Sequence, residues 1–404
     1  MERFLIKDAA KHAGEKVKIC GWVNTWRAHG KILFADLRDI SGIMQVVFVP
    51  SNQEVYDLAK QLRPEWVVEI EGQIVKRPES MVNPKMETGQ VEMSADGLKV
   101  LSTAETSPIP VGDETVVEPE IDIRLDWRWI DLRKPKNVLL FKVWTMMEQA
   151  FREYWTSNNY IEIHSPKLIA TASESGSEVF EVKYFKKKAF LAQSPQFYKQ
   201  MAMAAGFEKV FEVGPVFRAE PSFTSRHATE FTGYDAEISF IESHRDIMDE
   251  EERMINLGLQ KIKNAYGDKI KELFGREVVV PSLPFPRISM KETKEILSSR
   301  GIKSEKDGDL SPEEEREICA YVKEKHGHEF VFITEYPVSV RPFYHMRDEN
   351  NPALTKSFDL LWNGLEITTG AQREHRYDVL VSQAKEKGMN VKSLNFYLDF
   401  FKYG

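Results

Sequence analysis

The sequence predicts two unlike domains: a small closed β-barrel at the N-terminus and a larger α+β domain with a mixed, mainly antiparallel sheet. Three observations support this prediction. Short alternating strands fill the first hundred residues, a proline-rich acidic stretch follows, and strands and helices then succeed each other without a strict βαβ rhythm. The expected boundaries are 1–104 for the barrel, 105–130 for a hinge or linker, and 131–404 for the larger domain.

The barrel is expected from five short strands with apolar residues in alternation. They lie at 17–23, 32–39, 43–49, 67–74 and 90–94, and one polar helical segment is expected at 54–62. Five strands with one helix are typical of the OB-fold, which commonly binds single-stranded nucleic acid. From the pattern alone, another kind of small barrel stays open.

The larger domain is expected to begin with an amphipathic helix over 137–156, because apolar residues recur there on one helical face. The segment 160–169 predicts a strand that is stopped by Pro166. The remaining expected elements are a helix at 245–266 and strands at 188–193, 209–220, 232–241 and 365–372.

Composition excludes several classes of protein. The chain has 404 residues, of which 42% are hydrophobic, and no run approaches the ~20 apolar residues of a membrane helix. Its start has neither a secretory nor a transit pattern. Cys20 and Cys319 match no disulfide framework or metal spacing, so the expected location is the cytoplasm. With a net charge of −8, any nucleic-acid contact must be local.

The most informative stretch is 211–240, a strand, a polar loop and a second strand with charges in alternation. Residues two apart on a strand face the same side, so the charges of each strand converge on one surface. Two loop cations could clamp a polyphosphate, and an aromatic could stack on a base. From charge alone, an exposed hairpin with solvated salt bridges is the alternative. The charged residues are Arg218, Glu220, Asp235 and Glu237 on the strands and Arg226 and His227 in the loop.

Several blocks of the sequence resemble the class II aminoacyl-tRNA synthetases, in particular their aspartyl members. GPVFRAE (214–220), RH (226–227) and EFTGYDAE (230–237) resemble motif two of that family, and residues 151–169, with Pro166, resemble motif one. The other similar blocks are GWVNTWRAHGKILFADLRDISGIMQVVF, TASESGSEVF, AFLAQSPQFYKQ and FDLLWNGLEITTGAQREHRYDVL. The resemblance implies ATP-dependent activation of L-aspartate and its transfer to tRNA(Asp), with tRNA(Asn) as a further acceptor left open.

Within this family, one lysine favours aspartate over asparagine as the substrate. A site for aspartate must place cations at the side-chain carboxylate. The resemblance implies that Lys199, which asparaginyl members usually lack, and Arg373 hold this carboxylate. A bound amide would leave the lysine without a counter-charge, at a cost on the order of 1–3 kcal/mol. Taken alone, Lys199 could equally be a surface lysine on a helix.

The resemblance also implies the contacts of the amino acid and of ATP. Glu174 would reach the substrate amino group, and Gln196 and Asp235 would contact the aspartate. Arg218 would bridge the α-phosphate and the substrate carboxylate. For ATP, the implied residues are Glu220 at the adenine amino group, Phe231 beneath the ring, and Arg226 and His227 at the terminal phosphates.

Two further sites follow from the resemblance. Glu366 and the hydroxyl of Thr369 would hold Mg²⁺, which prefers hard oxygen ligands. In the barrel, Phe34 would stack on an anticodon base, and Arg27 and Gln45 would read the anticodon. The alternative for Phe34 is an inward-facing barrel residue.

The family carries a third motif, a Gly-rich strand and an arginine-bearing helix, in the region where the printed sequence stops at Gly404. This leaves as alternatives a truncated inactive chain and a non-catalytic tRNA-binding or regulatory paralogue. An asparagine–tRNA ligase is a second alternative, which Lys199 disfavours. A stand-alone asparagine synthetase would lack the barrel, and a generic OB-fold RNA binder explains only the first hundred residues. The resemblance of motif one implies a homodimer.

Overall fold

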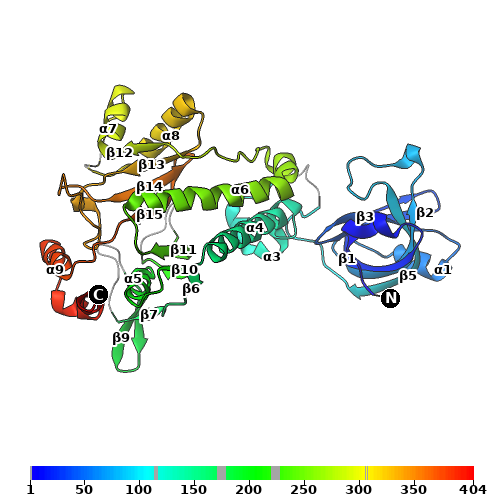
Figure 1. Cartoon of the computed structure of the whole chain (residues 1–404). Helices are drawn as coiled ribbons and strands as arrows, with labels where there is room; N and C mark the ends of the chain where they lie inside the picture. The colour runs from blue at the N-terminus through cyan, green and yellow to red at the C-terminus, as the bar shows by residue number, and fades with distance from the viewer. Residues whose placement is uncertain (1, 113–116, 171–178, 220–227, 305, 307) are drawn as a thin grey trace. The chain divides into compact units, whose positions relative to one another are not determined.

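The structure is a computed structural model that describes residues 2–112, 117–170, 179–219, 228–304, 306 and 308–404. It contains two compact units, Met1–Lys142 and Val143–Gly404, each described here by itself (Figure 1). The division falls inside helix α4 (Pro135–Ser157), which is later than the linker expected from the sequence. One reason is that Arg133 Nη1 donates to Glu65 of the first unit at 2.7 Å.

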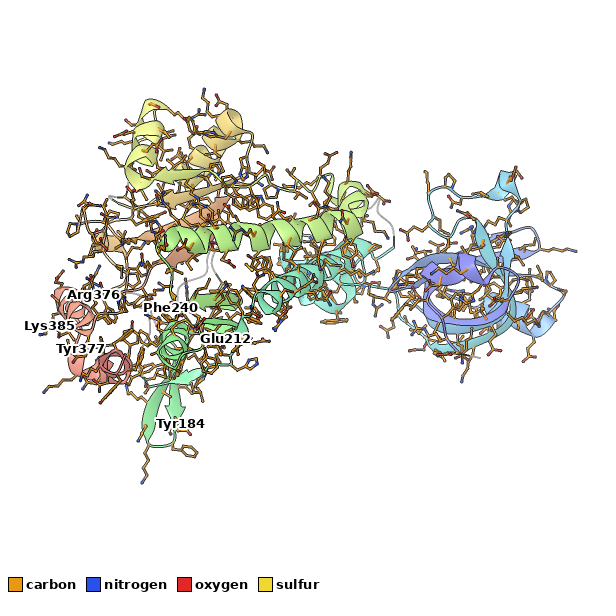
Figure 2. The ribbon with its side chains drawn as sticks, in the orientation of Figure 1. Tyr184, Glu212, Phe240, Arg376, Tyr377 and Lys385 are labelled. Carbon is orange, nitrogen blue, oxygen red and sulfur yellow. The ribbon has the colours of Figure 1, made fainter. Side chains whose placement is uncertain are left out.

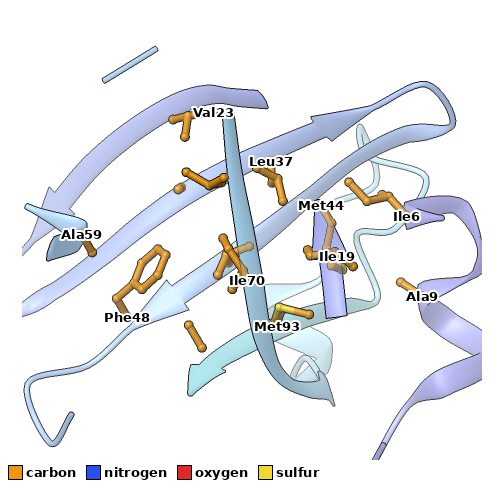
Figure 3. Close-up of a cluster of buried hydrophobic side chains, with 14 of the residues drawn as sticks. Ile6, Ala9, Ile19, Val23, Leu37, Met44, Phe48, Ala59, Ile70 and Met93 are labelled. Carbon is orange, nitrogen blue, oxygen red and sulfur yellow. The ribbon is translucent and has the colours of Figure 1, made fainter. Parts of the chain in front are cut away.

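The first unit is built on a closed five-stranded barrel in the order β1-β2-β3-β5-β4, which confirms the OB-fold. Side chains alternate between its core and its outer surface. Leu33, Ala35 and Leu37 of one strand are buried in this core. Figure 3 shows Leu37 and Ile70 among the core side chains. The strands are β1 (Lys16–His29), β2 (Ile32–Asp39), β3 (Gly42–Phe48), β4 (Val67–Lys76) and β5 (Val91–Ser102).

The segment that leads to α4 is held together by contacts to one buried carboxylate, that of Asp131, which we call the Asp131 hub. Asp131 is fully buried and accepts hydrogen bonds from Arg124 Nε (3.1 Å), Arg128 Nη1 (3.1 Å) and Asn137 Nδ2 (3.0 Å). Lys134 Nζ forms an ion pair with it at 3.0 Å. The helices are η1 (Ile6–His12), α1 (Gln53–Ala59), η2 (Glu79–Met81), α2 (Ile121–Asp126) and α3 (Arg128–Asp131).

The described residues of the second unit form three small sheets. Their orders are β11-β10-β6, β12-β13-β14-β15 and β7-β9-β8. The strands of the first are β6 (Ile161–Glu162), β10 (Lys209–Phe217) and β11 (Glu230–Ile238). Those of the second are β12 (Arg287–Ser289), β13 (Phe330–Thr334), β14 (Ser357–Trp362) and β15 (Leu365–Ala371). Those of the third are β7 (Leu168–Ile169), β8 (Glu181–Tyr184) and β9 (Lys187–Leu191).

Helix α6 (His244–Phe274) lies along the four-stranded sheet (Figure 1). Its N-terminus has a capping box made by Ser243 and Asp246. Met248 and Leu259 of this helix pack on phenylalanines of the sheet. The other helices are α5 (Gln196–Ala204), α7 (Met290–Ser299), α8 (Pro312–His326), η3 (Val338–Val340), α9 (Tyr377–Glu386), η4 (Val391–Leu394), α10 (Asn395–Leu398) and η5 (Asp399–Lys402).

In this unit the structure differs from the sequence prediction at the motif-one strand and in the four-stranded sheet. The strand expected at 160–169 is reduced to the two residues of β6 and the two of β7, with Pro166 between them. Strands β13 and β14 were not predicted, because they are buried on both faces and their apolar runs show no alternation. Within the described ranges, no helix is long and apolar enough to cross a membrane.

Candidate active site

The β10–β11 hairpin forms the floor of the candidate site. In its antiparallel register, residues directly opposite each other share one face of the hairpin. Glu212 (labelled in Figure 2) faces Asp235, Gly214 faces Gly233, and Val216 faces Phe231. A Cβ atom at Gly233 would lie 3.0 Å from Asp235 Oδ2. Gly214 and Gly233, which have no side chains, therefore separate an acidic end of the hairpin from an aromatic end.

Lys199 projects from α5 onto the acidic end. Its side chain is 3% exposed, and its Nζ donates to Asp235 Oδ1 at 3.0 Å and to the Ala236 carbonyl oxygen at 3.2 Å. The same Nζ lies 3.4 Å from Glu237 Oε2. Because a buried ammonium requires compensation, this helix lysine is committed to the hairpin and does not lie on the surface.

Arg373 reaches the same acidic end from the segment after β15. Its Nε lies 3.4 Å from Glu237 Oε1, and its Nη2 donates to Gln196 Oε1 at 2.9 Å. Gln196 Nε2 in turn donates to Glu237 Oε2 at 3.3 Å. Lys199, Arg373 and Gln196 therefore converge on the hairpin acids Asp235 and Glu237.

His345 forms a hydrogen bond with the Arg373 guanidinium. Burial, and then the positive charge of Arg373, lower the pKa of His345 well below its ordinary value, so the ring is neutral. Its Nε2 lies 2.9 Å from Arg373 Nη1 and accepts a hydrogen bond there. The guanidinium also lies over the Tyr344 ring, 5.4 Å from its centroid. These contacts hold Arg373 in one orientation.

Arg218 and Phe231 form the aromatic end. The guanidinium carbon of Arg218 lies 5.4 Å from the centroid of the Phe231 ring, and Phe231 is 38% exposed. Arg218 Nε is buried and finds no hydrogen-bond partner among the described residues. An exposed ring beside a guanidinium with donors to spare suits a base and a phosphate.

An acidic site lies on β14 and β15. Asp359, which is 4% exposed, faces Thr369 across the two strands, and Leu361 faces Glu366. Arg341 holds both partners, since its Nη2 donates to Asp359 Oδ2 at 2.6 Å and its Nη1 to Thr369 Oγ1 at 3.2 Å. Desolvation by the surrounding protein, and then the negative charge of Asp359, raise the pKa of Glu366.

This acidic site fits a hard divalent cation. Asp359 Oδ1 is buried and has no hydrogen-bond partner within the described part of the chain, so one carboxylate oxygen is left for a ligand. Glu366 and the Thr369 hydroxyl supply further oxygens, as Mg²⁺ requires. The described residues hold no group of three or more His, Cys, Asp or Glu that could bind a metal by themselves. A cation here would therefore complete its shell with water or phosphate oxygens.

On the barrel, the three residues expected to bind the anticodon lie together. Arg27 on β1 faces Phe34 on β2, its guanidinium carbon lies 5.4 Å from the ring centroid, and its Nη2 donates to Gln45 Oε1 at 2.5 Å. Phe34 is half-buried on the outer face, between the core residues Leu33 and Ala35. The alternative of an inward-facing Phe34 is therefore excluded.

The structure adds residues that sequence reasoning missed and leaves some of the expected ones undescribed. His345, Asp359 and Arg341 received no role from the sequence, and Glu237 was named only as one of the converging hairpin charges. The signal for Asp359 was its place within the FDLLWNGLE block. The expected ligands Glu174, Glu220, Arg226 and His227 lie outside the described residues.

Comparisons with known proteins agree with this geometry. Residues 120–404 match the class II tRNA synthetases (D, K and N), and residues 17–101 match the OB-fold nucleic acid binding domain. The aspartate–tRNA(Asp/Asn) ligase of Aeropyrum pernix is 42% identical over 395 residues, covering 97% of this chain and 87% of the relative. The aspartate–tRNA(Asp) ligase of Pyrococcus abyssi is 43% identical, covering 97% and 88%.

Solved structures give the same family. The asparaginyl-tRNA synthetase from Pyrococcus horikoshii complexed with asparaginyl-adenylate has a TM-score of 0.89 at 32% identity, covering 100% of this chain and 91% of that chain. The aspartyl-tRNA synthetase from Entamoeba histolytica has a TM-score of 0.88 at 30% identity, covering 100% and 85%. The resemblance seen in the sequence motifs is thereby confirmed, and the chain belongs to the class II tRNA synthetases of the D, K and N group.

Proposed function

We propose that the chain is an aspartate–tRNA ligase, which uses ATP to activate L-aspartate and transfers it to tRNA(Asp). The observation that carries the proposal is the convergence of Lys199 and Arg373 on one acidic end of the hairpin. The named curated relatives, which are aspartate–tRNA ligases, support it. Overall fold does not separate aspartate from asparagine, because the asparaginyl and aspartyl structures match almost equally well.

Charge balance explains the preference for aspartate. The described site has the cations Lys199, Arg373 and Arg218 and the hairpin carboxylates Asp235 and Glu237, while the carboxylate of Glu212 is paired with Lys167. The side-chain carboxylate of L-aspartate would add a negative charge beside Lys199 and Arg373. Asparagine lacks the side-chain carboxylate and would leave the buried Lys199 with less compensating negative charge.

Under this proposal the reaction has two steps. The aspartate α-carboxylate attacks the α-phosphorus of ATP, which releases pyrophosphate and leaves aspartyl-adenylate. The terminal ribose 3′-hydroxyl of the tRNA then attacks the activated carbonyl, which releases AMP. Arg218 would neutralise the charge that develops at the α-phosphate, and Phe231 would lie against the adenine. Such chemistry is governed by positioning and charge stabilisation and needs no side-chain nucleophile.

We propose that Asp359, Glu366 and Thr369 hold a Mg²⁺ ion, because they supply hard oxygen ligands. The ion would supply positive charge to the phosphates of ATP. Arg341 would keep Asp359 oriented through Oδ2 and leave Oδ1 for the ion.

The remaining partners rest on surface features. Phe34, Arg27 and Gln45 are proposed to bind the anticodon, and acceptance of tRNA(Asn) as well as tRNA(Asp) is a question for assay. A homodimer is proposed on the family's motif one, whose helix and strand expose apolar side chains: Trp144 is 57% exposed and Ile161 is 47% exposed. The free thiols of Cys20 and Cys319 fit the cytoplasm.

ATP–pyrophosphate exchange tests the proposal directly, with aspartate and then asparagine as the amino acid. We expect exchange with aspartate and little with asparagine, followed by charging of tRNA(Asp) transcript. Exchange with asparagine alone would assign the chain to the asparagine ligases. Absence of exchange together with binding of tRNA would favour the non-catalytic paralogue.

A further inference from the structure

The β8–β9 hairpin carries a concentration of positive charge that contrasts with the net charge of −8 of the chain. Lys183, Lys186, Lys187 and Lys188 fall within six residues, and all four are exposed. Only Lys188 forms an ion pair with an acid in the described structure, with Glu181 at 3.0 Å. Figure 1 shows this hairpin extending away from the body of its unit.

The register of the hairpin places like charges opposite each other. Lys183 on β8 pairs directly with Lys188 on β9, and Tyr184 pairs with Lys187. Directly opposed like charges destabilise an antiparallel pair. Because the fold itself gains nothing from this arrangement, an anionic partner is the simplest source of compensation.

The turn of the hairpin exposes two aromatic rings. Phe185 is 81% exposed and has a φ of 53°, a left-handed conformation in which glycine or asparagine is usual. Tyr184, labelled in Figure 2, is 50% exposed, and its ring centroid lies 5.0 Å from that of Phe185 in an edge-to-face arrangement. A strained and exposed phenylalanine at the tip of a lysine-rich hairpin contributes neither core packing nor good turn chemistry.

The chain connects this hairpin directly to the candidate active site. β9 ends at Leu191, and α5, which carries Gln196 and Lys199, begins five residues later. The five residues of β9 span roughly 15 Å at about 3.3 Å per residue. The lysines and rings at the tip are therefore within reach of an RNA whose 3′ end enters the site.

We propose that the β8–β9 hairpin binds the acceptor arm of tRNA. Lys183, Lys186 and Lys187 contact phosphates, and Phe185 stacks on an unpaired base near the 3′ end. Lysines next to exposed aromatic rings are typical of proteins that bind single-stranded nucleic acid. The identity of this RNA rests on the proposed function, while the charge, register and turn conformation are features of the hairpin itself.

The test uses the full chain, a tRNA(Asp) transcript and a minihelix that contains only the acceptor arm. Variant one is Lys183→Gln, Lys186→Gln and Lys187→Gln combined. We expect its Kd for both RNAs to rise by at least about tenfold and the slope of log K against log salt to decrease by about two to three. Variant two, Phe185→Asn, should weaken binding about fivefold to a hundredfold.

Thermal unfolding separates a binding role from a structural one. Phe185→Asn relieves the left-handed strain and the triple variant relieves like-charge repulsion, so both should melt at or above the wild-type temperature while binding RNA less well. A matched control, Lys291→Gln, Lys303→Gln and Lys325→Gln, removes three exposed lysines around α7 and α8. The control should keep most of the wild-type affinity.

Three results would overturn the proposal: wild-type affinity and salt slope in variant one, an equal loss in the control, or a loss confined to full-length tRNA. ATP–pyrophosphate exchange needs no tRNA and should be unchanged in all variants. If the wild-type chain exchanges with no amino acid, the proposed function fails, but the RNA-binding comparison still decides the role of the hairpin.

Discussion

Lys199 and Arg373 bind opposite oxygens of one carboxylate, that of Glu237. Lys199 Nζ lies 3.4 Å from Oε2, and Arg373 Nε lies 3.4 Å from Oε1. The two cations come from elements 174 residues apart in the chain (373 − 199), and the amide of Gln196 links Arg373 to the same Glu237 carboxylate. Lys199 and Arg373 are thus held in place before an amino acid binds, which reduces the reorganisation needed on binding.

Removing the lysine charge should therefore reduce the use of aspartate specifically. Lys199→Gln leaves the acids and the substrate carboxylate without one buried counter-charge, a loss of about 2–5 kcal/mol. We expect kcat/KM for aspartate in pyrophosphate exchange to fall by about 10²-fold or more, with KM for ATP little changed. Lys385→Gln on the exposed face of α9 is the control. Wild-type kinetics for Lys199→Gln would exclude the assigned role.

Arg218→Ala should nearly abolish pyrophosphate exchange. The variant loses the guanidinium proposed to bind the α-phosphate, and removal of one such donor costs about 10²–10³ in rate. Arg218→Lys keeps the charge but loses the planar fork, so a partial rate is expected. Exchange should be compared with thermal unfolding of the same variants. A well-folded Arg218→Ala chain that exchanges at the wild-type rate would show that the phosphate binds elsewhere.

Asp359→Asn should raise the Mg²⁺ concentration needed for activity by about tenfold to a hundredfold. The amide removes one hard anionic oxygen and also the ion pair with Arg341. A readout independent of catalysis is the shift of the unfolding temperature by Mg²⁺ with a non-hydrolysable ATP analogue. That shift should be present in wild type and reduced in the variant. Asp399→Asn, at the exposed ion pair with Lys402, is the control and should leave both readouts unchanged.

Stability should fall in acid partly through Asp131. Burial disfavours its charge, but the hydrogen bonds from Arg124 and the ion pair with Lys134 prevail and lower the pKa of Asp131 from 3.8 to about 2. The carboxylate therefore stabilises the fold by about 2 kcal/mol above pH 5, and this is lost as the pH falls through 3.8 toward 2.

Urea unfolding at pH 7 and at pH 3 measures this contribution. Asp131→Asn should remove about 1 kcal/mol from the pH-dependent part, in addition to a loss at both pH values from unpaired cations. Asp122→Asn, at an exposed position of α2, serves as the matched control. An identical pH dependence in wild type and Asp131→Asn would contradict the stabilising role assigned to the Asp131 carboxylate.

Phe34→Ala should weaken tRNA binding without affecting amino-acid activation. Stacking of a base on an aromatic side chain is worth about 1–3 kcal/mol, so KM for tRNA(Asp) should rise by about fivefold to a hundredfold. Because Phe34 lies on the outer face of the barrel, the unfolding temperature should change little. Leu33→Ala on the inner face is the contrasting variant and should lower the unfolding temperature strongly.

The parts of the fold that the sequence predicted are those with a local signal. The barrel strands β1, β2, β4 and β5 bury their residues largely in alternation, and α4 and α6 repeat their apolar residues with the helical period. The doubly buried β13 and β14 have no such period, so they were not predicted. Likewise, Lys199 and Arg373 were expected from family motifs, whereas His345 depends on a contact between segments that no local pattern encodes.

The shared carboxylate of Glu237 ties the two cations into one unit. Exchanging either cation for a neutral residue leaves the buried Glu237 carboxylate only partly paired, which costs free energy. The effects of changes at Lys199, Arg373 and Glu237 should therefore not add, because each effect depends on the charges that the other two positions still carry.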